Sequence, residues 1–183
     1  MDILMILHQL KIPTVFPDSV IEEANRVSET ISPEELEGRM DLRQELTVTI
    51  DGADAKDLDD AVALVKREDG TFVLTVSIAD VSYYVTENSE MDKEAFERGT
   101  SVYLTDRVVP MLPQRLSNGI CSLHPYEERL TLTARMEIDR SGTIYQHEIF
   151  PSVIQSNERL TYDEVNVLFN TNEASEKITP EIE

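Results

Sequence analysis

Two pairs of strand-like segments, each joined by a short polar turn, constrain the fold of this chain most. In the first pair the turn contains Asp69-Gly70, a dipeptide typical of tight hairpins. In the second pair the turn is the four-residue stretch 139–142, which ends in glycine. Hairpins make neighbouring strands antiparallel. Strands are therefore expected, mostly in antiparallel order, at residues 46–50, 61–67, 71–79, 129–138 and 143–154.

Helices are expected around these strands. Residues 2–11 predict a short and nearly all-apolar helix, which must bury itself against other parts of the protein. Other helices are predicted to begin after residues that commonly cap helix N-termini, namely Asp18, Ser32, Ser89 and Thr161. Glu35 and Glu164 complete capping boxes, and Gly99 can end the third of these helices. Together these elements predict an α+β fold with a mixed, mostly antiparallel sheet.

Length and composition place the chain among globular proteins. The 183 residues suit one domain or a large piece of one, and 40% of them are apolar. No apolar run approaches the roughly 20 residues of a membrane helix, so no membrane partner is expected. The N-terminus has no basic leader of the kind found in signal peptides. Cys121 is the single cysteine, which excludes an intramolecular disulfide and favours the reducing cytoplasm.

The formal net charge of −20 argues against nucleic-acid binding through a basic patch on this chain. A bound divalent cation would offset part of that charge. The remaining acidity indicates that any polyanionic partner is held by surfaces that this chain lacks.

An aspartate cluster lies between two predicted strands. The stretch "TIDGADAKDLDDAV", residues 49–62, contains five aspartates within ten residues: Asp51, Asp54, Asp57, Asp59 and Asp60. Gly52 permits a sharp turn, and the small Ala53 and Ala55 leave room for a ligand to approach. Carboxylate oxygens are hard ligands that suit Mg²⁺ or Mn²⁺ better than zinc, and no histidine or cysteine lies nearby.

Two simpler explanations compete with a catalytic metal site. An EF-hand loop needs glycine at its sixth position and glutamate at its twelfth, and the spacing fails whether the loop starts at Asp51 or at Asp57. A solvated acidic loop, with aspartates acting as turn and cap residues, explains the spacing about as well as a metal site does.

The cluster and three later motifs resemble a known family. "TIDGADAKDLDDAV" is similar to the signature that opens the catalytic domain of the ribonuclease R and ribonuclease II (RNB-domain) exoribonucleases. "VSIADVSYYV", "RGTSVYLTDRVVPMLPQRLSNGICSL" and "RLTYDEV" follow in the family's order, nearer to ribonuclease R than to ribonuclease II. The resemblance covers at least residues 41–168. One departure is Tyr83, where the family often has histidine.

The resemblance implies an activity and a set of site residues. It implies processive 3′-to-5′ hydrolysis of RNA to nucleoside 5′-monophosphates with Mg²⁺, or alternatively Mn²⁺. Single-stranded RNA 3′ ends are then the expected partner, and DNA is not expected. The family's four acidic positions fall on Asp51, Asp57, Asp59 and Asp60, as catalytic residues and metal ligands. Asp54 is not one of the four.

A tyrosine is the second kind of site residue that the resemblance implies. Tyr103 occupies a position at which the family stacks a tyrosine on a terminal base, and this contact helps to set the size of the end product. Without the resemblance, a half-buried strand tyrosine is the simpler interpretation. The histidines are scattered without metal-ligand spacing, and Arg107, Arg115 and Arg129 suit either phosphates or the many acidic side chains.

The resemblance also predicts how the chain divides. Residues 1–40 are expected to be a helical lead-in segment, residues 41–169 the N-terminal part of an RNB-type catalytic domain, and residues 170–183 a loose polar tail. The family's later arginine motif and its flanking RNA-binding domains are not found in this sequence. The chain is therefore expected to be an interior segment that is inactive alone. Such a segment can still fold, expose apolar surface and associate with itself.

Two other function classes remain open. A non-catalytic acidic module that binds metal or protein would need the acidity alone. A phosphatase or nucleotide hydrolase would use similar metal chemistry, but the chain lacks a glycine-rich phosphate loop.

Overall fold

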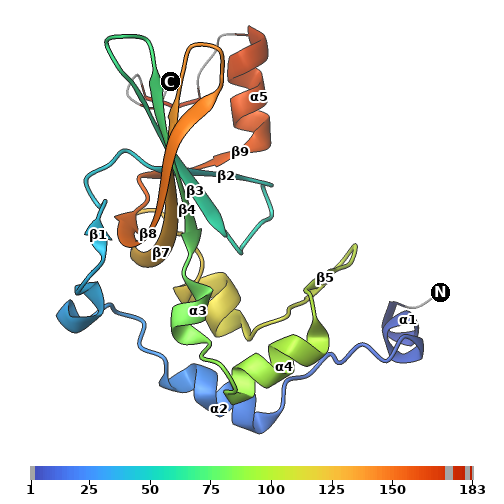
Figure 1. Cartoon of the computed structure of the whole chain (residues 1–183). Helices are drawn as coiled ribbons and strands as arrows, with labels where there is room; N and C mark the ends of the chain where they lie inside the picture. Colours follow the sequence, from blue (N-terminus) through green and yellow to red (C-terminus); the bar gives the residue numbers. More distant parts are fainter. Residues whose placement is uncertain (1–2, 172–174, 180–181, 183) are drawn as a thin grey trace. The chain divides into compact units, whose positions relative to one another are not determined.

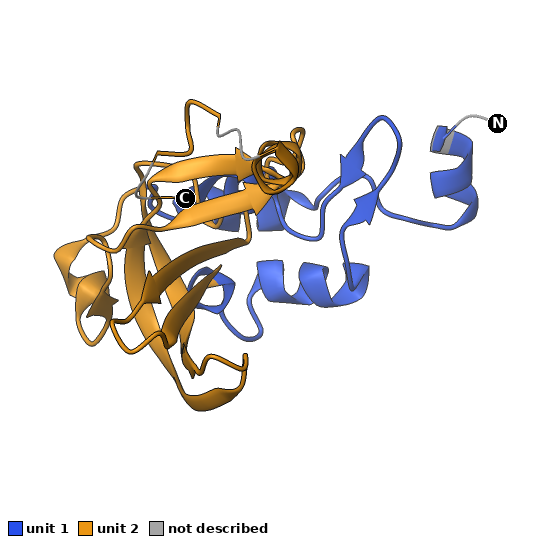
Figure 2. Ribbon diagram, turned by 90° about the horizontal axis from the view of Figure 1, so that it is seen from above, with its two compact units in different colours: residues 1–29, 81–120 blue, residues 30–80, 121–183 orange. Residues whose placement is uncertain are grey.

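The computed structural model describes residues 3–171, 175–179 and 182. The chain forms two compact units, shown in orange and blue in Figure 2. The sheet unit consists of residues 30–80 and 121–183, and the helical unit of residues 1–29 and 81–120. These units are defined by packing, so the expected domain boundaries after residues 40 and 169 stay a prediction.

A seven-stranded sheet forms the centre of the sheet unit, in the order β1-β8-β7-β4-β3-β2-β9 (Figure 1). Two outer pairs, β1 with β8 and β2 with β9, are parallel, and the other four neighbouring pairs are antiparallel. The expected α+β fold with a mostly antiparallel sheet is therefore confirmed. The strands are β1 (Met40–Asp41), β2 (Val48–Asp51), β3 (Asp60–Lys66), β4 (Phe72–Ala79), β7 (Glu128–Ile138), β8 (Ile144–Gln155) and β9 (Glu158–Thr161).

Both predicted hairpins are present. The β3–β4 hairpin pairs Lys66 with Phe72, and Gly70 takes a φ of +82° in its turn. Glycine adopts this left-handed conformation without the steric cost of a Cβ. The β7–β8 hairpin turns at Gly142, where φ is +86°, and the Asp139 carboxylate accepts the amide of Thr143 at 2.9 Å. The turn residues visible in the sequence therefore set both connections.

The buried face of the central strands is lined by hydroxyl groups. Ser77 Oγ lies 2.8 Å from Thr133 Oγ1, and Ser152 Oγ lies 2.5 Å from Thr133 Oγ1 and 2.7 Å from Thr131 Oγ1. All four residues are buried, so these mutual hydrogen bonds replace those lost to water. Successive residues of a strand point to opposite faces. The other face consequently carries large apolar side chains with substantial exposure: Leu64 (61%), Ile78 (45%), Leu132 (48%) and Ile149 (67%).

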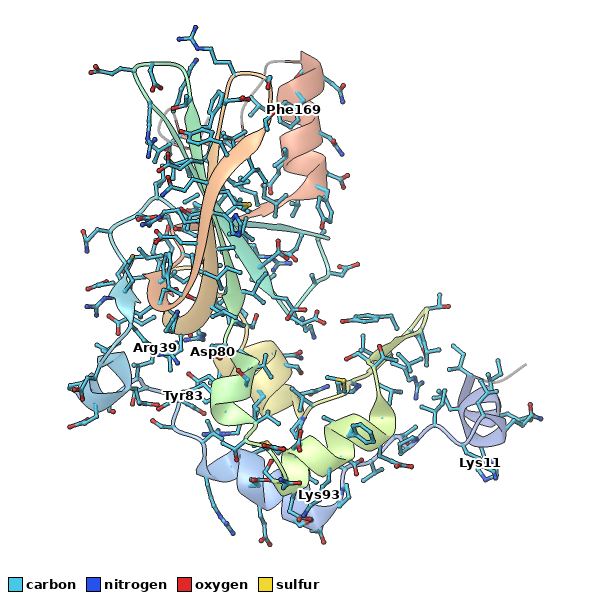
Figure 3. The ribbon with its side chains drawn as sticks, viewed as in Figure 1. Lys11, Arg39, Asp80, Tyr83, Lys93 and Phe169 are labelled. Atoms are coloured by element: carbon cyan, nitrogen blue, oxygen red, sulfur yellow. The ribbon has the colours of Figure 1, made fainter. Side chains whose placement is uncertain are left out.

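A largely buried ion pair lies just after the end of β4. Arg39 Nη2 donates to Asp80 Oδ2 at 2.7 Å, and both residues are labelled in Figure 3. Arg39 Nη1 also donates to the carbonyls of Thr131 and Ser152 at 3.3 Å each. One side chain therefore links β4, β7 and β8 before the chain leaves the sheet unit at Val81.

The helical unit is made of short elements. Its helices are α1 (Ile3–Gln9), α2 (Asp18–Arg26), α3 (Val81–Tyr84) and α4 (Glu90–Arg98), its strands β5 (Val102–Tyr103) and β6 (Val108–Val109), and a π-helical turn covers Leu116–Ile120. The Arg98 guanidinium lies 3.7 Å from the Phe16 ring centroid and donates to the carbonyls of Pro13 and Pro110 at 3.0 and 3.2 Å. Segments about 100 residues apart are joined in this way.

The helix ends agree with the caps expected from the sequence, with one correction. Ser89 Oγ accepts the amide of Asp92 at the start of α4, and Gly99 ends that helix with a φ of +73°. Thr161 and Glu164 form the expected capping box before α5 (Tyr162–Thr171). The expected N-cap Asp18 is wrong, because Pro17 is the cap and Asp18 is the first helical residue.

Two other segments differ from expectation. Residues 33–36 form a 3₁₀ helix, with the Ser32 amide donating to Glu35 Oε2 at 2.6 Å as the capping box requires. The opening helix α1 buries Leu7, but Met5 remains 55% exposed, so burial of the whole helix is not seen in this chain. Asp2, its expected first residue, lies outside the described residues.

None of the described helices is long and apolar enough to cross a membrane.

Replacing Thr133 with valine tests the buried hydroxyl network. Thr133→Val keeps the shape of the side chain but removes the hydroxyl that contacts both Ser77 and Ser152. We expect the free energy of unfolding to fall by about 1–3 kcal/mol, because a buried hydroxyl loses its partner. Urea unfolding measures this change. Thr143→Val, at the exposed turn of the same β7–β8 hairpin, is the control and should change stability by less than about 0.5 kcal/mol.

Candidate metal-binding active site

The four expected acidic residues lie where β2 ends and β3 begins. Asp51 is the last residue of β2, Asp60 is the first residue of β3, and Asp57 and Asp59 lie in the connecting loop. We call residues 51–60 the aspartate loop. Charged side chains are tolerated here because the loop reaches water: Asp59 and Asp60 are exposed.

Arg159 of β9 holds the first half of the aspartate loop. Its Nη2 atom donates to the carbonyls of Gly52 (3.2 Å), Ala53 (2.9 Å) and Ala55 (2.8 Å). The Ala55 amide donates to the Gly52 carbonyl at 3.1 Å, which closes a turn. The guanidinium therefore ties this turn to the strand that pairs with β2.

Ser122 holds the second half. The buried Ser122 Oγ accepts the amide of Leu58 at 3.0 Å and donates to the carbonyl of Lys56 at 2.9 Å. The Leu123 amide donates to the Leu58 carbonyl at 2.9 Å, and the Leu58 side chain is fully buried. Asp57 and Asp59 thus flank a residue that is anchored through both its backbone and its side chain.

The aspartates influence one another's ionisation. Burial raises the pKa of Asp51, the negative charges of Asp60 and Asp57 add to the rise, and the positive charge of Arg159 opposes it. Partial removal from water, together with the carboxylates of Asp57, Asp60 and Asp51, raises the pKa of Asp59. A divalent cation would favour the charged forms and so relieve this repulsion.

The carboxylate oxygens of the aspartate loop suit a hard metal ion, but in the described structure they do not form a complete coordination site. Within the described residues, Asp51 Oδ2 is buried without a hydrogen-bond partner, so this oxygen is able to accept a ligand. Among the residues that the structure describes, however, no three acidic, histidine or cysteine side chains converge closely enough to hold an ion. The four residues therefore share one loop and one electrostatic environment, and their role as metal ligands stays a prediction.

Tyr103 lies in the helical unit, on β5. Its side chain is 63% exposed, which differs from the half-buried strand tyrosine of the simpler interpretation. Exposure is what base stacking requires, and the proposed RNA contact remains a prediction.

The remaining candidates have structural partners. Cys121 is buried, and burial raises its pKa to about 12, so it behaves as a small apolar residue rather than a nucleophile. Arg115 pairs with Glu29 and Arg107 with Asp106. Arg129 Nε donates to the Ser122 carbonyl at 2.8 Å.

Sequence reasoning missed the two residues that anchor the aspartate loop. Arg159 lies in the motif "RLTYDEV" and Ser122 in "NGICSL", so both motifs were noticed without a role for these side chains. The signal was their presence in two of the motifs that carry the resemblance.

Comparison with known proteins agrees with the fold. The model of the RNB domain matches residues 39–183. Ribonuclease R 1 of Lactococcus lactis is 55% identical over 174 residues, which are 95% of this chain and 21% of that protein. Ribonuclease R of Thermotoga maritima is 52% identical over 162 residues, which are 88% and 23% of the two chains. The chain thus spans between a fifth and a quarter of the length of these relatives.

Solved structures give the same result. Mycoplasma genitalium RNase R in complex with double-stranded RNA is 38% identical, with a TM-score of 0.88 over 93% of this chain and 30% of that chain. Yeast Ssd1, described as a pseudonuclease, is 22% identical with a TM-score of 0.71, over 83% and 18% of the two chains, and shares the fold alone. Because the family model covers most of the chain, this protein belongs to the RNB domain family.

Proposed function

We propose that this chain provides the aspartate loop of a processive 3′-to-5′ exoribonuclease that hydrolyses RNA to nucleoside 5′-monophosphates. The observation that carries the proposal is the position of Asp51, Asp57, Asp59 and Asp60 on one anchored loop within the matched RNB domain. The likeness to proteins named ribonuclease R supports this choice of reaction. The partner is then the single-stranded 3′ end of RNA, without DNA or a membrane.

The four aspartates would hold Mg²⁺, or alternatively Mn²⁺. When bound, such an ion polarises the scissile phosphate and lowers the pKa of a bound water. Asp51 and Asp60, at the strand ends, would be the most direct ligands because the sheet fixes their backbone. Asp57 and Asp59 would complete the ligand set or orient the attacking water.

The charge of the chain bears on how RNA would be bound. With a net charge of −20, this chain repels a polyanion over most of its surface. We infer that phosphate contacts come from other parts of a longer protein, while Tyr103 contributes stacking on a terminal base. We also infer a cytoplasmic location, from a single cysteine that is buried and reduced.

A non-catalytic acidic module is the alternative. It is favoured by the observation that no three metal-ligating side chains converge in the described part of the chain. An intact hydrolytic activity that depends on the aspartate loop would exclude it.

Asp59→Asn tests the catalytic role of the loop, in the longest polypeptide that contains this chain. We expect RNA hydrolysis to fall by roughly 10²-fold or more, because a charged group that binds metal or positions water is lost. RNA binding should stay nearly unchanged. Gel assays of product release and a fluorescence binding titration measure the two effects. Asp54→Asn, in the same loop, is the control and should retain hydrolysis, whereas near-normal cleavage by Asp59→Asn contradicts the proposed role.

Tyr103→Ala tests the stacking contact. Loss of one stacked base costs about 1–3 kcal/mol, so the shortest bound fragment should be released earlier and the final product should change in length. High-resolution electrophoresis of the end products measures this. Tyr145→Ala, which removes another exposed tyrosine in the sheet unit, should leave the end product unchanged. An unaltered end product with Tyr103→Ala removes the role.

The 183-residue chain alone should have little or no nuclease activity in Mg²⁺. Its net charge disfavours RNA, and its apolar sheet face, which includes Leu64, Leu132 and Ile149, is exposed and can promote self-association. RNA degradation assays and light scattering on the purified chain measure both properties. Robust RNA degradation by this chain contradicts the expectation.

A further inference from the structure

Arg159 joins the aspartate loop through backbone contacts rather than ion pairs. Its Nη2 atom donates to the carbonyls of Gly52, Ala53 and Ala55, at 3.2, 2.9 and 2.8 Å. Within the described residues, no carboxylate lies within ion-pair distance of this guanidinium. The hydrogen bonds of Arg159 to these three carbonyls therefore fix the path of the backbone after β2.

The strand pair β2–β9 places Arg159 directly beside the start of the loop. Arg159 pairs with Thr49, and Asp51 pairs with Thr161 two residues farther along. Residues two apart on a strand point to the same face. Arg159 and Asp51 therefore lie on the same face of the sheet. The Arg159 guanidinium extends to the turn that follows Asp51.

Unsatisfied polar atoms gather on this strand pair. Thr49 Oγ1, Asp51 Oδ2 and Arg159 Nε are buried without a hydrogen-bond partner in the described part of the chain. The first and third of these residues face each other in the strand register. Buried polar atoms in native proteins usually have partners, so this concentration indicates that a ligand or ordered water completes the site.

We propose that Arg159 is a positioning residue that holds the 52–55 turn beside Asp51, and that the aspartate loop needs this hold to bind a divalent cation. This inference rests on the proposed function of the same loop. Arg159 does not contact the reacting atoms. It acts through the backbone carbonyls, while Ser122 anchors the second half of the loop.

Two roles for Arg159 predict opposite effects on metal affinity. If Arg159 were only a positive charge near the carboxylates, its removal would make the loop bind cations more tightly, because like-charge repulsion between guanidinium and metal would disappear. If Arg159 positions the loop, its removal weakens binding, since the turn that follows Asp51 is no longer held in place. Loss of residues that orient metal ligands typically lowers affinity by about 10- to 100-fold.

Arg159→Met and Arg159→Lys separate these roles in the 183-residue chain, with Mn²⁺ as the probe. Isothermal titration and the electron paramagnetic resonance of free Mn²⁺ measure affinity without any assay of activity. We expect Arg159→Met to weaken Mn²⁺ binding about tenfold or more. Arg159→Lys keeps the positive charge but loses the planar guanidinium. This variant should bind Mn²⁺ at least as weakly as Arg159→Met does. Circular dichroism checks folding, and Arg159→Lys decides the test if Arg159→Met does not fold.

A matched control distinguishes loop positioning from a general effect of losing an arginine. Arg140 also donates to a backbone carbonyl, that of Asp69 in the β3–β4 turn, at 2.8 Å from Nε. Arg140→Met should leave Mn²⁺ affinity unchanged. Hydrogen exchange at the Ala55 amide gives a metal-free measurement, and should become faster in Arg159→Met but not in Arg140→Met.

Different results would contradict either the positioning role of Arg159 or the metal site itself. Unchanged or tighter Mn²⁺ binding by the folded Arg159 variants, while Asp51→Asn loses binding, overturns the positioning role alone. Unchanged exchange at Ala55 in those variants also overturns it. Failure of the unsubstituted chain to bind Mn²⁺, or binding that Asp51→Asn does not weaken, overturns the proposed metal site and the inference with it.

Discussion

Hydrogen bonds from arginine side chains to backbone carbonyls hold the irregular parts of this protein in place. A guanidinium presents five donors in one plane, so a single side chain can bind carbonyls from several segments. Arg98 does this for the loops of the helical unit and Arg159 for the aspartate loop, while Arg39 bridges β7 and β8 through the carbonyls of Thr131 and Ser152. The loops that Arg98 and Arg159 bind lack the regular pairing of a sheet or helix, and these contacts help to fix their course.

This use of arginine also explains why the arginines of this acidic chain do not give it a basic surface. Of 36 acidic and 16 basic side chains, several arginines are committed to internal contacts and do not form a basic surface. Arg115 and Arg129, which a phosphate-binding interpretation would place on RNA, bind carbonyls and carboxylates of their own chain. Near the aspartate loop, the positive charge of Arg159 offsets part of the acidity from within the sheet unit.

Local signals in the sequence were sufficient for much of the fold. Asp69-Gly70 and the 139–142 turn predicted both hairpins, because a turn that needs a left-handed residue restricts the choice of amino acids. Ser89 and Thr161 predicted helix starts, because only a few side chains can accept the free amides there. Asp18 failed as a cap because Pro17 already has the extended backbone that a cap requires, which begins the helix one residue earlier.

The hairpins, most helix caps and the position of four aspartates between two predicted strands could be derived from the amino-acid sequence. Those features depend on residues that are close together along the chain. The buried face of the sheet depends on long-range packing, since Ser77 and Thr133 become suitable core residues when their hydroxyl groups meet across strands. The same long-range packing places β9 beside β2 and brings Arg159 to the aspartate loop, because these contacts join residues more than 100 positions apart, and no local pattern records such a pairing.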